Sequence, residues 1–254
     1  MGRTDESGTE PVARDFERQW RKRFERFADN EDDAGIAGWS ENGLDARFSH
    51  FRNHWRPGAP GGFWLDVGCG AGTYTRYMRE NGKEVLALDY SLPTLKKARA
   101  RVGGGAHWAL GDASRLPLRR NSLDGVLCFG VTQALSESGP LVSELNRVVR
   151  GGGEVWVDGL NRGCALDFWA RALRKMRGEE ENVRFESPRG LAEELRRAGA
   201  ERVELYWVPV FPSGWHRLQR FFNRYWVGRV LDRTPFLGAL VCHAFVLKGE
   251  APHG

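Results

Sequence analysis

The sequence predicts an α/β fold in which a mostly parallel sheet is covered by helices on both faces. The first observation is an apolar run at 63–67 that passes through glycines at alternate positions into a helix-compatible segment at 73–81. The second is the repetition of this scheme, since apolar runs at 85–89 and 107–110 also end at or just before an acid. Strands and helices that alternate in this way form parallel sheets through right-handed crossovers.

The turn after the first predicted strand has the character of a nucleotide-binding turn. Gly68, Gly70 and Gly72 allow positive φ angles and leave bare main chain for a ligand, although a purely structural turn uses the same residues. Asp66 lies two residues before the first glycine, where dinucleotide-binding turns carry no acid. Asp89 ends the next strand, where a carboxylate meets ribose hydroxyls. The pattern therefore predicts a cofactor that contains a nucleoside.

The alternation continues through the rest of the chain. We expect further strands and helices at these positions: strands at 124–129, 153–158, 203–208 and 242–247, and helices at 93–102, 139–149 and 187–199. Two of the helix starts carry capping serines, Ser91 and Ser187, and Pro188 occupies the first turn of the second.

The N-terminal region has a different character. Residues 1–12 are polar and predicted to be disordered. Aromatic residues recur at helical spacing in 13–28 and again in 44–55, so 13–58 is predicted to be a helical cap that stops at Pro57. Packing on the sheet and capping of the cofactor cleft both remain open as its role.

Two insertions interrupt the alternation, at 159–186 and 209–240. The first contains one amphipathic helix. The second is predicted to hold a helix that opens at Pro212 and Ser213, and its apolar and basic residues lie on different faces through 213–231. Both insertions begin at the carboxyl ends of strands, which is where ligands bind in open α/β sheets. We therefore interpret the insertions as lids.

Four motifs occur in order along the chain: Asp66-x-Gly68-x-Gly70-x-Gly72, Asp89, Gly111-Asp112-Ala113 and Glu144-x-x-Arg147-Val148-Val149-x-Gly151-Gly152. Together they resemble class I S-adenosylmethionine-dependent methyltransferases of the small-molecule, type 11 kind. The resemblance covers residues 60–160, with weaker echoes to 248. It implies a Rossmann-like seven-stranded mixed sheet within 59–254, whose seventh, antiparallel strand lies between the fifth and the sixth.

The resemblance also implies S-adenosylmethionine as the cofactor and assigns the residues that hold it. The implied binding residues are Asp66, Gly68, Cys69, Gly70, Gly72, Phe129 and Gly130 for the methionine portion, Asp89 for the ribose, and Tyr90, Asp112 and Ala113 for the adenine. Within this set, Asp66 is expected near the amino end of the methionine, and Asp89 is expected to accept hydrogen bonds from both ribose hydroxyls.

The residues that act on the methyl acceptor are harder to predict. A hydroxyl acceptor benefits from a positioned base, and histidine is the commonest choice. His216, in the first turn of the second predicted lid helix, is our candidate base, with surface or lid packing as the alternative. Gln133 is a candidate for orienting the acceptor, with a solvent contact as the alternative. His107, at the start of a strand, and His243, inside one, are expected to be structural.

Composition restricts the class of protein further. The 254-residue chain is 41% hydrophobic, and no apolar run reaches the ~18 residues of a membrane span. The N-terminus lacks signal-peptide character, so a cytoplasmic protein is expected. The four cysteines have no paired spacing, and His50 and His54 have no third ligand motif beside them, so neither a disulfide framework nor a metal site is expected.

The sequence favours a methyltransferase that acts on a small, partly apolar acceptor such as a quinone, lipid, sugar or secondary metabolite, on oxygen rather than nitrogen or carbon. The net charge of +5 keeps an RNA or protein methyltransferase open as an alternative. A third interpretation is a non-catalytic module that binds the cofactor or a membrane surface, because residues 213–231 also fit a basic amphipathic helix. Base-methylating motifs are missing after Phe129, a nucleic-acid partner is disfavoured, and no obligate protein partner is evident.

Overall fold

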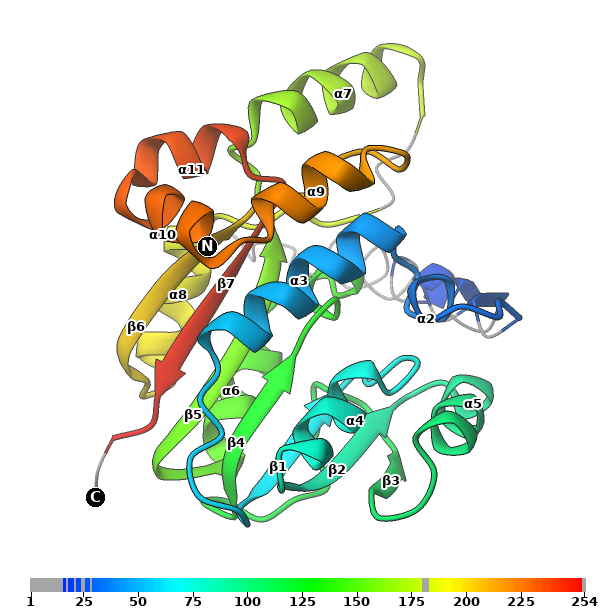
Figure 1. Cartoon of the computed structure of the whole chain (residues 1–254), viewed down its shortest axis with the longest axis vertical. Coiled ribbons are helices and arrows are strands. Elements are labelled where there is room, and N and C mark those ends of the chain that lie inside the picture. Colours follow the sequence, from blue (N-terminus) through cyan, green and yellow to red (C-terminus); the bar gives the residue numbers. More distant parts are fainter. Residues whose placement is uncertain are drawn as a thin grey trace, which may run out of the picture.

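The sheet has seven strands in the order β3-β2-β1-β4-β5-β7-β6 (Figure 1). The computed structural model describes residues 16, 18–20, 22, 23, 26, 27, 29–179 and 183–252. Strand β7 runs antiparallel to both of its neighbours, β5 and β6, and the other pairs are parallel. The predicted mixed sheet, with its seventh strand between the fifth and the sixth, is confirmed.

The strands are β1 Phe63–Val67, β2 Glu84–Asp89, β3 His107–Leu110, β4 Leu123–Cys128, β5 Val149–Leu160, β6 Glu201–Val208 and β7 Ala244–Glu250. In the centre of the sheet, Asp66 of β1 lies beside Ala87 of β2 and Leu127 of β4. β7 starts two residues later than expected, so the prediction that His243 lies inside a strand is wrong. His243 instead precedes β7, where its imidazole binds a carboxylate of the first insertion.

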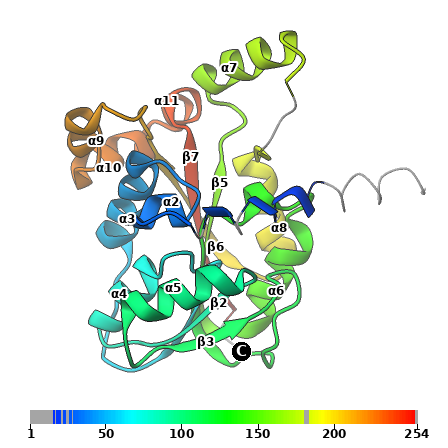
Figure 2. The same cartoon turned by 90° about the vertical axis from the view of Figure 1, so that its right-hand side faces the viewer.

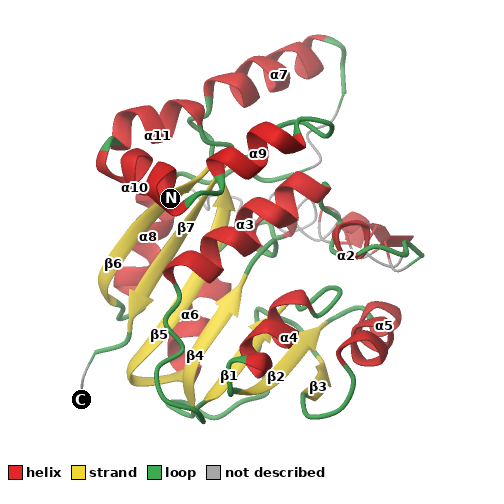
Figure 3. Ribbon diagram, viewed as in Figure 1, coloured by secondary structure: helices red, strands yellow, loops and turns green. Residues whose placement is uncertain are grey.

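The helices are α2 Asp33–Ile36, α3 Glu41–His54, α4 Thr73–Glu80, α5 Leu92–Val102, α6 Gly139–Val148, α7 Ala165–Met176, α8 Pro188–Arg197, α9 His216–Phe222, α10 Tyr225–Arg233 and α11 Pro235–Val241, with a short 3-10 turn, η1, at Thr132–Ala134. Ser91 accepts a hydrogen bond from the Thr94 amide, and Ser187 accepts one from the Gly190 amide, as predicted. Helices α3, α4 and α5 lie on one side of the sheet, and α6 and α8 lie on the other (Figures 2 and 3).

The prediction of one helix opening at Pro212 is wrong. Residues 213–231 contain α9 and most of α10, which are separated by the extended backbone of Arg224, and α11 follows after Pro235. A proline without an amide hydrogen starts α11 because it cannot continue α10. Another short helix, α2, lies where only a glycine-rich link was expected. The described residues between 16 and 27 are helical, whereas the predicted disordered tail, 1–12, lies outside the described residues.

The N-terminal cap packs on the sheet through aromatic rings. The rings of Trp55 in α3 and Trp64 in β1 have centroids 5.3 Å apart, and those of Phe51 and Trp156 in β5 are 5.4 Å apart. Edge-to-face pairs of this kind add about 0.5–1.5 kcal/mol each to the burial of their surface. The aromatic periodicity of 44–55 is therefore explained by packing, which places the start of α3 next to the carboxyl ends of the central strands.

Candidate active site

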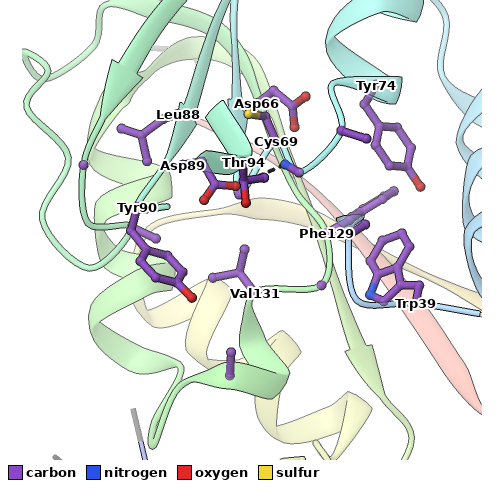
Figure 4. Close-up of a pocket in the computed structure, with 18 of the residues that line it drawn as sticks. Trp39, Asp66, Cys69, Tyr74, Leu88, Asp89, Tyr90, Thr94, Phe129 and Val131 are labelled. Carbon is purple, nitrogen blue, oxygen red and sulfur yellow. Dashed lines mark hydrogen bonds between the residues drawn. The ribbon is translucent and has the colours of Figure 1, made fainter. Parts of the chain in front are cut away.

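The main pocket lies beyond the carboxyl ends of the central strands (Figure 4) and has an empty volume of about 1080 Å³, its open mouth included. Its walls come from the β1–α4 turn, the ends of β2, β3 and β4, the η1 turn and the N-terminal cap. Of the described residues, none in 159–186 or 209–240 lines this pocket. The N-terminal cap thus covers the pocket, and the role of the two insertions as lids stays a prediction.

The glycine turn between β1 and α4 is shaped by close neighbours on both sides. Gly68 has φ +68°, and a Cβ atom there would lie 2.5 Å from the Val131 side chain. Gly72 has φ +81°, and a Cβ atom there would lie 2.6 Å from Val102 at the end of α5. Gly68 therefore keeps the pocket open beside Val131, whereas Gly72 lets α4 approach α5.

Asp89, at the tip of β2, fastens the glycine turn and faces the pocket. The Gly70 amide donates to its Oδ2 at 3.1 Å, and the Ser91 amide donates to its Oδ1 at 2.9 Å. Burial raises the pKa of Asp89 to about 6. The Tyr90 backbone donates a further hydrogen bond to this carboxylate. Because a carboxylate has about four acceptor sites, Asp89 still has acceptor capacity that fits a hydroxyl group, such as one of those of a ribose.

Asp66 is buried at the other end of the glycine turn and has a protein partner for one oxygen. The Thr75 hydroxyl donates to its Oδ2 at 2.5 Å, and only 2% of the side chain is exposed. Burial raises the pKa of Asp66 to about 7. A buried carboxylate without a cation beside it is costly, so the site fits a ligand that brings a positive charge, such as an amino group.

Every residue predicted to bind the cofactor lines the pocket, with the exception of Gly72. At the end predicted to hold adenine, Tyr90, Asp112 and Ala113 line the pocket, and Asp112 accepts a hydrogen bond from the Ser114 amide at 2.9 Å. At the opposite end, Phe129 and Gly130 close the carboxyl end of β4. The residues present fit S-adenosylmethionine, and the individual contacts to it stay predictions.

The two predicted acceptor residues lie outside the walls of this pocket. His216 begins α9, its side chain is 51% exposed, and its Nδ1 lies 3.0 Å from Asn42 Oδ1. Gln133 is buried in η1, where its backbone carbonyl oxygen accepts a hydrogen bond from the Arg184 backbone amide at 3.1 Å. The structure does not bring either residue to the cofactor end, and their catalytic roles stay predictions.

Sequence reasoning missed the apolar end of the pocket, which Trp39, Tyr74 and Phe129 line together (Figure 4). The Trp39 Nε1 atom and the Tyr74 hydroxyl are buried and have no hydrogen-bond partner among the described residues. Buried donors of this kind usually have partners, and a ligand in the pocket would reach these two after a small side-chain movement. Tyr74 could have been predicted to line the pocket, because it directly follows Thr73 at the end of the glycine turn. Trp39 could not, because its segment shows no helical or strand periodicity.

A buried ion pair supports this apolar end from behind. Arg47 of α3 donates from Nε to Asp158 Oδ2 at 2.6 Å, and both side chains are almost fully buried. The other oxygen of Asp158 accepts a hydrogen bond from the Gly130 amide at 2.7 Å, and the Arg47 guanidinium lies 4.7 Å from the Trp39 ring centroid. The pair thereby fixes the cap, the end of β4 and β5 relative to one another.

In the part of the chain that the structure describes, no three histidine, cysteine, aspartate or glutamate side chains are grouped so that they would hold a metal ion. Over the same residues, no helix has the length and apolar character needed to span a bilayer.

The strand order, the glycine turn after β1 and the carboxylate at the tip of β2 together define a class I methyltransferase fold. Residues 65–157 match the family described as "Methyltransferase domain". The chain therefore carries a class I methyltransferase domain, of the kind that uses S-adenosylmethionine as methyl donor.

Curated relatives are similar over part of the chain. A malonyl-[acyl-carrier protein] O-methyltransferase of Serratia marcescens is 40% identical over 122 residues, which are 47% of this chain and 46% of the relative. The same enzyme of Salmonella typhimurium is 43% identical over 91 residues, 36% of each chain. The chain thus matches less than half the length of these relatives.

Solved structures share the fold over a longer stretch. The methyltransferase in complex with the Trm112 methyltransferase activator of Haloferax volcanii has a TM-score of 0.64 at 18% identity, covering 91% of this chain and 98% of that one. Phosphoethanolamine N-methyltransferase 2 of Haemonchus contortus, in complex with S-adenosyl-L-methionine, has a TM-score of 0.63 at 18% identity, covering 91% of this chain and 60% of that one.

Proposed function

We propose that this protein transfers a methyl group from S-adenosylmethionine to an oxygen atom of a small, partly apolar acceptor, such as a quinone, lipid, sugar or secondary metabolite. The observation that carries the proposal is the division of one pocket into two ends. One end presents the carboxylates of Asp66 and Asp89, and the other presents an aromatic wall with the buried donors of Trp39 and Tyr74.

The cofactor end would hold its ligand through groups already in place. Asp89 would accept hydrogen bonds from the ribose hydroxyls with its remaining acceptor capacity, and Asp66 would pair with the amino group of the methionine portion. Bound S-adenosylmethionine supplies a methyl group that is already activated on a sulfonium. The chain therefore has to align the acceptor and exclude water, and the N-terminal cap residues Trp20, Trp39 and Leu44 in the pocket wall would do the latter.

The acceptor end favours an oxygen acceptor. Trp39 Nε1 and Tyr74 OH would donate hydrogen bonds to it once a small side-chain movement exposes them, while the rings of Phe129 and Trp39 would contact its apolar part. No histidine, lysine or glutamate of the described chain lines the pocket. An acidic hydroxyl or a carboxyl, which is ionised near neutral pH, suits such a site because it needs no protein base.

Label transfer tests this proposal. Purified protein is incubated with methyl-labelled S-adenosylmethionine and a cell extract divided into apolar, protein and RNA fractions. We expect label in the apolar fraction, and less of it with Trp39→Phe/Tyr74→Phe, a variant that retains affinity for S-adenosylhomocysteine. Label only in RNA would overturn the proposal in favour of an RNA methyltransferase. Label only in protein would overturn it in favour of either a protein methyltransferase or an acceptor bound to a carrier protein.

A second candidate acceptor is the carboxyl group of an acyl chain bound to a carrier protein. The relatives named malonyl-[acyl-carrier protein] O-methyltransferases favour it, and a carboxylate also suits the two donors of the apolar end. Formation of a methyl ester on malonyl-carrier protein, monitored by mass spectrometry, would distinguish this acceptor from a free small molecule.

A further inference from the structure

The large apolar side chains that remain exposed are concentrated on the helices of the two insertions. In the described chain, only two of them, Leu92 and Leu110, lie elsewhere. The others are Leu166, Phe168, Trp169, Leu173 and Met176 on α7, Trp215, Phe221, Tyr225, Trp226 and Val230 on and beside α9 and α10, and Phe236, Leu237, Leu240 and Val241 on α11. An apolar concentration of this kind marks an interaction site rather than the scattered exposure of an ordinary surface.

Helix α7 is attached to the protein by its polar side. Asp167 accepts a hydrogen bond from His243 Nδ1 at 2.7 Å, and Arg171 donates to the carbonyl of Arg162 at 2.8 Å. None of the residues of α7 is buried. The spacing of Leu166 and Trp169, continued at positions 173 and 176, places four apolar side chains on one side, and each is 49–76% exposed. The helix thus presents its apolar side to the surroundings.

Helix α11 extends this apolar region. Phe236 is 83% exposed, and Leu237 and Leu240 are 44% and 43% exposed. The two helices are in contact, and both lie at the end of the molecule beyond the carboxyl ends of the parallel strands (Figures 1 and 2). We call the exposed apolar side chains of α7 and α11 the apical surface.

The positive charge near the apical surface comes from the second insertion. Residues 215–241 contain five arginines and one acid, Asp232, whereas residues 159–186 contain six basic and five acidic residues. On α7, the basic residues Arg174 and Lys175 are exposed. Three tryptophans in these segments, at 169, 215 and 226, are 66%, 58% and 55% exposed. Tryptophan is enriched at the headgroup level of bilayers, and arginine and lysine are attracted to anionic lipids.

We propose that the apical surface docks the protein on an anionic lipid bilayer. The apolar side chains of α7 and α11 enter the boundary between headgroups and acyl chains, and the neighbouring arginines and lysine neutralise lipid phosphates. The insertions begin at the end of the sheet where the pocket lies, so docking would turn that end towards the membrane. The proposal does not depend on methyl transfer, because docking requires only these surface side chains.

Co-sedimentation of the full chain with vesicles tests the proposal. We expect the protein to pellet with phosphatidylcholine vesicles that contain about 30% phosphatidylglycerol, and to pellet less with pure phosphatidylcholine or at high salt. Trp169→Glu/Leu173→Glu should lower the partition coefficient about tenfold. Leu92→Glu, on α5, is the matched control and should leave partition unchanged. Circular dichroism and thermal unfolding verify that each variant is folded.

Three results would overturn the proposal. The first is a folded wild-type protein that stays in the supernatant with anionic vesicles. The second is partition that is equal for Trp169→Glu/Leu173→Glu and for the control. The third is a protein that does not bind vesicles but forms a dimer, or a complex with an acidic carrier protein, and loses this association in Trp169→Glu/Leu173→Glu. The apical surface would then be a protein interface.

Discussion

Replacing Asp66 by asparagine tests whether the pocket contains a buried charge that is unfavourable in the cofactor-free protein. Burial raises the pKa of Asp66 from its ordinary value of 3.8 to about 7. The folded protein therefore holds this proton more tightly than the unfolded chain does. The favourable contribution of Asp66 to stability is complete below pH 3.8 and is lost as the pH rises towards 7. Asparagine keeps an oxygen that accepts from Thr75, but it carries no charge.

The pKa difference sets the size of the effect. At about 1.4 kcal/mol per pH unit, a rise from 3.8 to about 7 corresponds to about 4 kcal/mol. Water entry and side-chain relaxation reduce this penalty in a folded protein. We expect Asp66→Asn to raise the free energy of unfolding of the cofactor-free protein by about 1–3 kcal/mol at pH 8, and to have little effect near pH 4.

Urea unfolding at several pH values between 4 and 8 measures this difference. Thr75→Val serves as the opposite perturbation, because it removes the donor to the carboxylate and should destabilise the protein more at pH 8 than at pH 4. Asp66→Asn should at the same time weaken binding of S-adenosylmethionine. Equal destabilisation by Asp66→Asn at every pH would refute the assignment of a raised pKa.

Three further predictions concern the pocket and its support. Trp39→Phe and Tyr74→Phe should each raise the KM for the acceptor about tenfold, because each removes a hydrogen-bond donor, and should leave the affinity for S-adenosylhomocysteine unchanged. An equal loss of affinity for the acceptor and for S-adenosylhomocysteine would contradict a role in acceptor binding. Arg47→Met should destabilise the protein by about 3–5 kcal/mol in urea unfolding, because it leaves Asp158 buried and unpaired, and Arg47→Met/Asp158→Leu should be more stable than the single variant. The calorimetric affinity for S-adenosylmethionine should fall by up to about tenfold between pH 7 and pH 6, as Asp66 takes up a proton, and Asp66→Asn should lack this part of the fall; below pH 6, protonation of Asp89 should lower the affinity of both proteins.

The sheet could be predicted from the sequence because its signals are local. Each central strand is a short apolar run that ends in glycine or an acid, and Asp89 follows from its place at the tip of the second run. The serine caps of α5 and α8 were visible for the same reason, since a cap depends on neighbouring residues.

The acceptor end could not be predicted because its contacts are remote in sequence. Arg47 and Asp158 are separated by 111 positions, and neither has a local pattern that identifies its partner. The second insertion shows a different limit. Its apolar and basic positions fit one helix, but the extended residue Arg224 and Pro235 divide the segment into three helices, and packing on β6 decides which faces are buried.

The central claim is that this pocket binds S-adenosylmethionine through Asp89. Its most direct test is calorimetric titration of the purified protein with S-adenosylhomocysteine, beside the Asp89→Ala variant. We predict micromolar affinity for the wild-type protein and a loss of at least about 100-fold in the variant, since two hydrogen bonds to a charged group contribute about 1.5–3 kcal/mol each. Equal affinity of the two proteins, or no binding by the folded wild-type protein, would contradict the claim.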